Sequence, residues 1–164
     1  MKQVTAFGLL LLLISCGQTK LSDVEVIKFD TKSITDLKQT SDTIYSEFIG
    51  RTDFYTADWF VNRKNSVITK LFKDSIGNVV AHNKTKNDKV FFAIEYFPNG
   101  QARGKLPEKI NGEYNGQVRY YYEYGRVKSE GQFKKGLWSG EWKNYDKDGH
   151  LISIDDYGDR NVNP

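Results

Sequence analysis

The sequence has few of the residues that build cross-linked or catalytic sites. It contains one cysteine, two histidines and three prolines among 164 residues. A single cysteine excludes an internal disulfide framework. The chain also lacks the spacing of a zinc site, a Gly-x-Ser-x-Gly elbow and a phosphate-binding loop. The two histidines, His82 and His150, are expected at or near hairpin ends in surface roles. We therefore expect a protein that is not an enzyme and needs no cofactor.

An excess of charge of one sign is lacking as well. The 24 basic and 21 acidic residues leave a net charge of +3, and this balance argues against nucleic acid as a partner. A long hydrophobic run is also missing. The apolar stretch from Val4 to Ile14 is too short to cross a bilayer as a permanent helix.

That stretch follows Lys2 and has the anatomy of a cleaved secretion signal. Its end, Leu13-Ile14-Ser15-Cys16, resembles the lipobox of bacterial lipoproteins. The resemblance implies that residues 1–15 are removed and that Cys16 carries acyl chains, which together form a stable membrane anchor. An ordinary secretory leader followed by a chance cysteine is the alternative. We expect a lipid-anchored protein of the bacterial cell envelope, at the outer membrane, with residues 16–23 as lipidated cysteine and tether.

Glycine and aromatic residues, by contrast, are plentiful, with 14 Gly, 10 Tyr, 10 Phe and 3 Trp. Four glycines recur at intervals of 23, 25 and 24 residues: Gly77, Gly100, Gly125 and Gly149. The residues before them suit a type I turn, and the glycine suits the positive φ that follows it in a hairpin. The sequence therefore predicts a hairpin turn at each glycine.

The chain after Gly125 alternates in the manner of a half-buried strand. Val127, Ser129, Gly131 and Phe133 are predicted to share one side of it. Aromatic rings of one hairpin are expected to lie over Ser or Gly of its neighbour. The predicted fold is an all-β, elongated antiparallel meander of stacked hairpins. Its repeat core is expected to contain Val118, Tyr120, Tyr122, Phe133 and Trp142.

Residues 88–157 resemble the bacterial variant of the MORN repeat, most closely over residues 112–149. The family's glycine and aromatic pattern is matched by Glu130, Gly131, Phe133, Gly136, Gly140 and Trp142. The resemblance implies scaffolding, self-association or membrane apposition rather than one chemistry. Many bacterial members are called antitoxin-like by similarity.

The rest of the chain is expected to extend the same domain. Residues 24–87 read as a β region with degenerate repeats, and residues 158–164 as a tail. Strands are predicted around Val24 and over residues 44–48, 54–61 and 67–72. Residues 31–43 could form a helical turn or a loop, and residues 83–88 a turn or flexible loop.

Two surface features suit a ligand. Residues 100–143 hold nine bases and five acids, which predicts either a basic face for anionic lipid or acidic glycan, or polar positions that only keep the sheet soluble. The aromatic stripe is either a sugar-binding platform or the seam between hairpins. The candidate binding face comprises Arg119, Tyr121, Tyr124, Arg126 and Lys128.

The stretch from Asn144 to Asp155 imitates a calcium loop of the EF-hand kind, with Asp146 and Asp148 ahead of Gly149. Strands are expected to flank it where helices are required, and the repeat explains the glycine. We therefore expect no metal.

The leading hypothesis is a non-catalytic scaffold or protein-binding module that binds another protein or itself. A module binding glycan or anionic lipid is one alternative. An immunity or antitoxin-like lipoprotein is the other.

Overall fold

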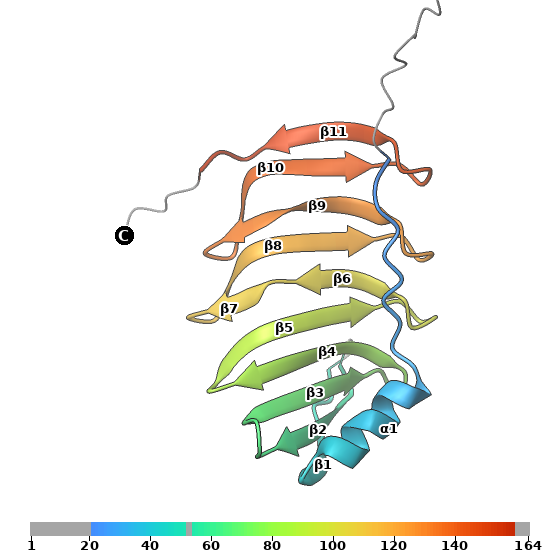
Figure 1. Cartoon of the computed structure of the whole chain (residues 1–164), viewed down its shortest axis with the longest axis vertical. Coiled ribbons are helices and arrows are strands. Elements are labelled where there is room, and N and C mark those ends of the chain that lie inside the picture. Colours follow the sequence, from blue (N-terminus) through green and yellow to red (C-terminus); the bar gives the residue numbers. More distant parts are fainter. Residues whose placement is uncertain (1–20, 52–53, 160–164) are drawn as a thin grey trace, which may run out of the picture.

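The computed structural model describes residues 21–51 and 54–159. It is one antiparallel sheet of 11 strands with a single helix (Figure 1). Strands that follow one another in the chain are hydrogen-bonded neighbours in the sheet, with one exception. β6 is followed in the sheet by β8, and the short strand β7 pairs with β8 outside this order. The elements are α1 (Thr31–Thr40), β1 (Thr43–Phe48), β2 (Thr56–Asn62), β3 (Val67–Lys73), β4 (Val79–Lys86), β5 (Lys89–Tyr96), β6 (Ala102–Leu106), β7 (Glu108–Ile110), β8 (Glu113–Tyr121), β9 (Val127–Lys134), β10 (Leu137–Tyr145) and β11 (Leu151–Asp156).

The predicted all-β antiparallel meander is thus confirmed. The predicted signal segment and Cys16 lie outside the described residues. Among the described helices there is none of the length and apolar character that a membrane crossing requires.

The sheet is a single layer with two different faces. Residues directly opposite each other in paired strands share a face, and one such row crosses the whole sheet. Its members are Glu47, Ala57, Phe72, Ala81, Glu95, Gly104, Tyr120, Ser129, Asn144 and Ser153. We call the face that bears this row the open face. The other, the covered face, bears His82 and Tyr121 and packs against α1 and residues 21–30.

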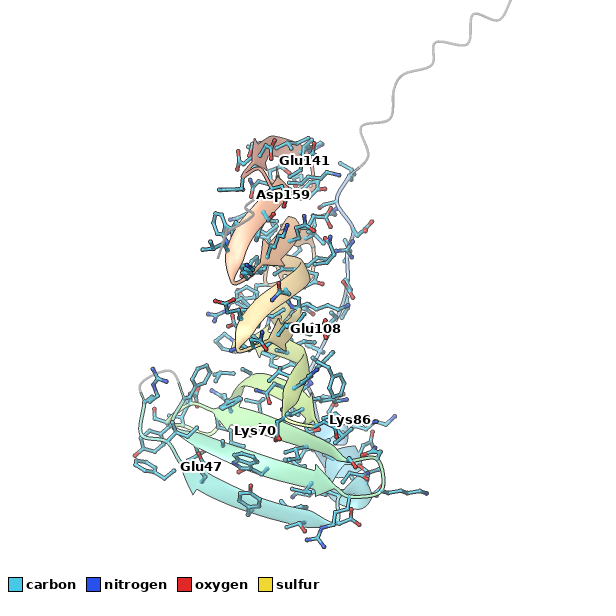
Figure 2. The ribbon with its side chains drawn as sticks, turned by 90° about the vertical axis from the view of Figure 1, so that its left-hand side faces the viewer. Glu47, Lys70, Lys86, Glu108, Glu141 and Asp159 are labelled. Atoms are coloured by element: carbon cyan, nitrogen blue, oxygen red, sulfur yellow. The ribbon has the colours of Figure 1, made fainter. Side chains whose placement is uncertain are left out.

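The sheet twists along its length. Figure 2 shows the broad open face of the lower strands, with Glu47 and Lys70 labelled on it and α1 behind, while the strands from β8 to β11 are seen from the side. This is the twist expected of an open antiparallel sheet.

The four turn glycines close turns of identical bonding. At each, the glycine N–H donates to the carbonyl three residues earlier, and that earlier residue donates to the carbonyl after the glycine. Gly125 donates to Tyr122 at 2.9 Å, and Tyr122 donates to Arg126 at 2.8 Å. The glycines have φ between +80° and +95°: Gly77, Gly100, Gly125 and Gly149. A type I turn followed by a left-handed glycine produces this pattern.

A β-bulge follows every one of these turns. Tyr121 pairs with Val127 but Tyr120 pairs with Ser129, so Lys128 is the extra residue. Val127 therefore belongs to the covered face and Ser129 to the open face. The prediction that these two share a side is wrong, because strict alternation does not survive a bulge.

Small residues lie beneath aromatic rings, as predicted. A Cβ added to Gly104 would lie 3.1 Å from the Tyr120 ring, and one added to Gly131 would lie 2.4 Å from Cδ2 of Trp142. Of the predicted repeat core, Val118 and Trp142 are buried and the other three residues are half-buried.

Residues 21–30 form an extended strap across the turns (Figure 1). The amides of Ser22, Glu25 and Phe29 donate to the carbonyls of the three later turn glycines, over distances of 2.8 to 3.0 Å. Half-buried Ile27 and Phe29 pack against the buried cluster of the covered face. The strand predicted around Val24 is therefore an isolated β-bridge between Val24 and Arg126, not part of the meander.

Two other segments bear on predictions made above: the structure decides between the two alternatives for residues 31–43, and it corrects the prediction for residues 83–88. Residues 31–40 form a helix, which Asp30 caps by accepting from the Ser33 amide at 2.9 Å. Residues 83–86 belong to β4 rather than to a loop. The turn there is only Asn87 and Asp88, both with positive φ.

Candidate ligand-binding groove on the open face

The predicted binding face does not exist as one surface. Tyr121 is 1% exposed and is among the largest fully buried side chains. Its hydroxyl donates to the Glu25 carboxylate at 2.6 Å, so it is a core residue and not a ligand contact. Arg119 lies on the same covered face and pairs with Glu130 at 3.0 Å and with Glu25 at 3.6 Å.

The remaining three residues of that set are also separated. Tyr124 is exposed at its turn, where its hydroxyl donates to the carbonyl of Lys147. The Arg126 guanidinium donates to the Ser22 carbonyl at 3.2 Å, beneath the strap. Only Lys128 reaches the open face, because the bulge places it there. The prediction fails for two reasons. The strap of residues 21–30 covers the face that bears Arg119 and Tyr121, and the bulge after Gly125 puts Lys128 on the opposite face.

The bases of residues 100–143 are likewise divided between surfaces. Lys105 pairs with Glu25 on the covered face, Lys109 lies over the Tyr114 ring, and Arg103 pairs with Glu95 at 3.0 Å. The excess of positive charge in the sequence therefore does not gather on one face of the sheet.

A groove of about 630 Å³ lies on the open face between β5 and the chain that follows β11. Its size is typical of small-ligand sites. Aromatic side chains and hydrogen-bonding side chains share its wall. The lining comprises Tyr120, Trp138, Trp142 and Tyr157 with Glu95, Phe97, Arg103, Lys128, Ser129, Asn144 and Asp155, and it also touches Tyr121.

The aromatic wall combines a fixed ring with an accessible one. Trp142 is 3% exposed and lies flat over Gly131. Trp138 is 45% exposed, with its ring centre 4.7 Å from that of Trp142 and 5.1 Å from that of Tyr157. Because its neighbours limit its rotation, Trp138 offers a positioned apolar surface to solvent.

One donor in this wall has no partner among the described residues. The indole Nε1 of Trp142 is buried and makes no hydrogen bond there. A buried donor left unpaired costs about 1–3 kcal/mol, so an acceptor at this point would be favourable.

The polar wall is ordered by its own hydrogen bonds. The Asn144 amide nitrogen donates to Ser153 Oγ at 3.0 Å and to Asp155 Oδ2 at 2.8 Å. Arg103 and Lys128 occupy equivalent bulge positions in successive hairpins. Two acids and two bases thus face the groove, with an amide and a hydroxyl between them.

Neither histidine contributes to the groove. His150 is exposed beside Asp146 at a hairpin end, where it was expected. His82 instead lies in β4, buried, with Nδ1 2.6 Å from the Tyr96 hydroxyl. Burial, followed by the charge of Lys84, lowers the pKa of His82 to about 4.

The acidic turn that imitates a calcium loop has a structural use. Asp146 accepts hydrogen bonds from the amides of Asp148 and His150 at 2.9 and 2.8 Å. These bonds lower the pKa of the Asp146 carboxyl, the one from His150 most. Asp74 accepts from the amides of Ile76 and Asn78 in the same way at the Gly77 turn, three turns earlier, so the carboxylate belongs to the turn.

Several groove residues were not predicted as contacts, notably Trp138, Asn144 and Tyr157. A signal was present for the first, because Trp138 lies four residues before Trp142, which was expected in the repeat core. Alternation alone could not assign their common face, since the register of β10 shifts between Ser139 and Lys143. Tyr157 had no such signal, since it reaches the groove only by the turn of the chain after β11. There its amide donates to the Gly140 carbonyl at 3.0 Å.

Comparisons with known proteins give a fold and no family. No protein family model matches the chain, and neither does any curated protein. The structure is similar to one chain in the crystal structure of a GtfA/B complex, with a TM-score of 0.50 and 10% sequence identity. The match covers 77% of this chain and 24% of that one. At such low identity the likeness concerns the fold alone.

Proposed function

We propose that this chain is a non-catalytic binding module of the bacterial cell envelope and that its open-face groove binds a carbohydrate. The observation that carries the proposal is that the accessible Trp138 ring lines the same groove as an ordered amide and carboxylate, Asn144 and Asp155. Aromatic faces pack on the apolar faces of sugar rings. Amide and carboxylate groups accept and donate the bonds that sugar hydroxyls require.

The charges of the groove favour a sugar of low net charge. Glu95 and Asp155 balance Arg103 and Lys128, and Arg103 is already paired with Glu95. A strongly anionic glycan or lipid headgroup would need a surplus of free bases, which this face lacks among the described residues. The glycan alternative is therefore preferred to the anionic-lipid alternative.

The test is binding of the protein made without residues 1–16 to purified envelope glycans, such as insoluble peptidoglycan in a sedimentation assay. We expect saturable binding that Trp138→Ala reduces about tenfold or more, since one stacked ring contributes about 1–3 kcal/mol. Trp59→Ala is the matched control, because Trp59 lies on the same face in β2, away from the groove. Equal binding by both variants would contradict the proposal.

A protein-binding or self-associating scaffold is the second candidate, and the sheet edges favour it. The outer strands β1 and β11 carry exposed apolar side chains, among them Phe48 and Ile152. Open edges of this kind invite pairing with another strand. Sedimentation velocity over a range of concentrations should show association that Ile152→Lys abolishes. A monomer at every concentration would remove self-association from this candidate.

The anchor is a separate part of the proposal, inferred from the lipobox-like sequence before Cys16. Labelled palmitate should be incorporated by the full chain and not by its Cys16→Ser variant. Equal labelling of both would disprove lipidation at Cys16.

A further inference from the structure

A second cavity of about 360 Å³ lies on the covered face, between α1 and strands β3 to β5. Its wall is largely apolar and aromatic, formed by Ile27, Phe29, Leu37, Phe92, Ile94 and Tyr96. The groove described above is on the opposite face, so the two sites are independent.

The helix spans this cavity instead of filling it. α1 is held at both ends, by the Asp30 cap and by Asn62, whose amide nitrogen donates to the Thr40 carbonyl at 2.6 Å. None of its residues is buried, although a surface helix ordinarily buries its apolar stripe. Ile34 and Leu37 are only half-buried, which leaves apolar volume beneath the helix.

The floor of the cavity is polar but uncharged at neutral pH. His82 lies among three aromatic rings, with centres 4.9 to 5.6 Å from its own, and Tyr96 occupies its Nδ1. An imidazole in such surroundings stays neutral.

Charge appears only at the rim. The charged side chains that line the cavity are Lys28, Lys84 and Asp36, two bases against one acid. The Lys84 ammonium lies 5.4 Å from the centre of the Phe92 ring, beside the apolar wall. A ligand that complements this site has an apolar body and one negative charge.

We propose that this cavity binds a medium-chain aliphatic monocarboxylate, with its chain beneath α1 and its carboxylate beside Lys84. The apolar wall would bind the aliphatic chain through the hydrophobic effect. Lys84 at the rim would donate a charge-assisted hydrogen bond to the carboxylate.

The test uses the protein made without residues 1–16 and sodium octanoate as the probe, and binding is followed by methyl NMR of Leu37 and Ile94. Saturable shifts of both methyl signals are expected, and octanol should bind about tenfold more weakly because it lacks the charge. If octanoate causes no saturable shift of these two methyl signals, the proposed site is wrong. Octanol that binds equally well would overturn the role assigned to the rim.

Two variants of the cavity and one control variant make the result specific. Lys84→Gln should weaken octanoate about tenfold and leave octanol unchanged, whereas Lys86→Gln, at an exposed position outside the cavity lining, should change neither. Leu37→Trp should fill the space and block both probes while the β-sheet spectrum is retained. Undiminished binding by the folded Leu37→Trp protein would contradict the location.

Discussion

The Tyr121 hydroxyl donates a hydrogen bond of 2.6 Å to the carboxylate of Glu25, a residue 96 positions earlier in the chain. This bond joins the strap to the middle of the repeat stack. Burial alone would raise the pKa of Glu25, but hydrogen bonds from Tyr121 and Lys105 outweigh it and lower that pKa. The carboxylate is therefore held ionised as an acceptor for the core.

Tyr121→Phe should lower the free energy of unfolding by about 2 kcal/mol, because it removes a hydrogen bond to a charged acceptor. Tyr122→Phe is the matched control, since its hydroxyl donates at 2.8 Å to a neutral carbonyl, that of Tyr145. Its loss should be about 1 kcal/mol. Urea unfolding measures both, and a larger effect at the control position would contradict the role of the strap.

Gly100→Ala should be more damaging than Gly77→Ala, although both glycines have similar positive φ values of 80° and 91°. A Cβ at Gly100 would lie 2.9 Å from the Phe29 carbonyl oxygen of the strap, whereas one at Gly77 meets nothing within 4 Å. The backbone conformation alone costs about 1–2 kcal/mol in each variant. Displacement of the strap is added only at Gly100.

Trypsin cleavage separates these two effects. Lys28 lies in the strap beside Gln101, so a displaced strap should be cut faster there. We expect faster cleavage for Gly100→Ala and the wild-type rate for Gly77→Ala. The same rate in both variants would show that the strap does not depend on that glycine.

Gly131→Ala should disturb the groove from below. Its new Cβ would lie 2.4 Å from Cδ2 of Trp142, against 3.1 Å between a Cβ at Gly104 and the Tyr120 ring. Overpacking of this kind costs about 1–3 kcal/mol, so Gly131→Ala should lose more stability than Gly104→Ala and shift the tryptophan emission. Equal stability of the two variants would argue against tight packing beneath Trp142.

His82 should make stability depend on pH in a defined window. Its pKa is lowered to about 4 in the folded chain by burial and by Lys84, whereas an unfolded histidine titrates near 6.5. The unfolded state therefore takes up a proton first as the pH falls. Unfolding free energy should decrease by about 3 kcal/mol between pH 6.5 and 4.

His82→Phe is the comparison for this dependence, because it removes the titrating group and keeps a ring among its aromatic neighbours. Its unfolding free energy should be flatter over the same window. Carboxyl groups with lowered pKa values, such as Asp58, lose their contribution progressively below about pH 5, but they do so in both proteins and cancel in the comparison. Parallel curves for variant and wild type would contradict the assignment.

The sequence was sufficient for the repeat, the turns and the placement of rings over glycines, since these follow from local rules of φ and alternation. It was not sufficient to predict on which face the side chains after each turn lie. After Gly125, for example, the bulge at Lys128 places Val127 on the face opposite to Ser129. The strap could not be predicted from the sequence either. No pattern within residues 21–30 indicates that their amides donate to three turn carbonyls more than 70 positions away.

The candidate site was likewise predicted only in part. Trp142 was predicted as core and is buried, while Tyr121 was assigned to a ligand and belongs to the core. The groove depends on the order of strands and on the return of Tyr157 to Trp138. Such contacts are set by tertiary structure and not by sequence pattern.

The most direct test of the carbohydrate proposal is a titration followed through the three indole N–H signals. The tryptophans are Trp59 on the lower open face and Trp138 and Trp142 in the groove. We expect a bound envelope glycan fragment to shift the Trp138 and Trp142 signals saturably and to leave Trp59 unchanged. Binding that moves only Trp59, or that moves none of the three, would contradict the groove as the binding site.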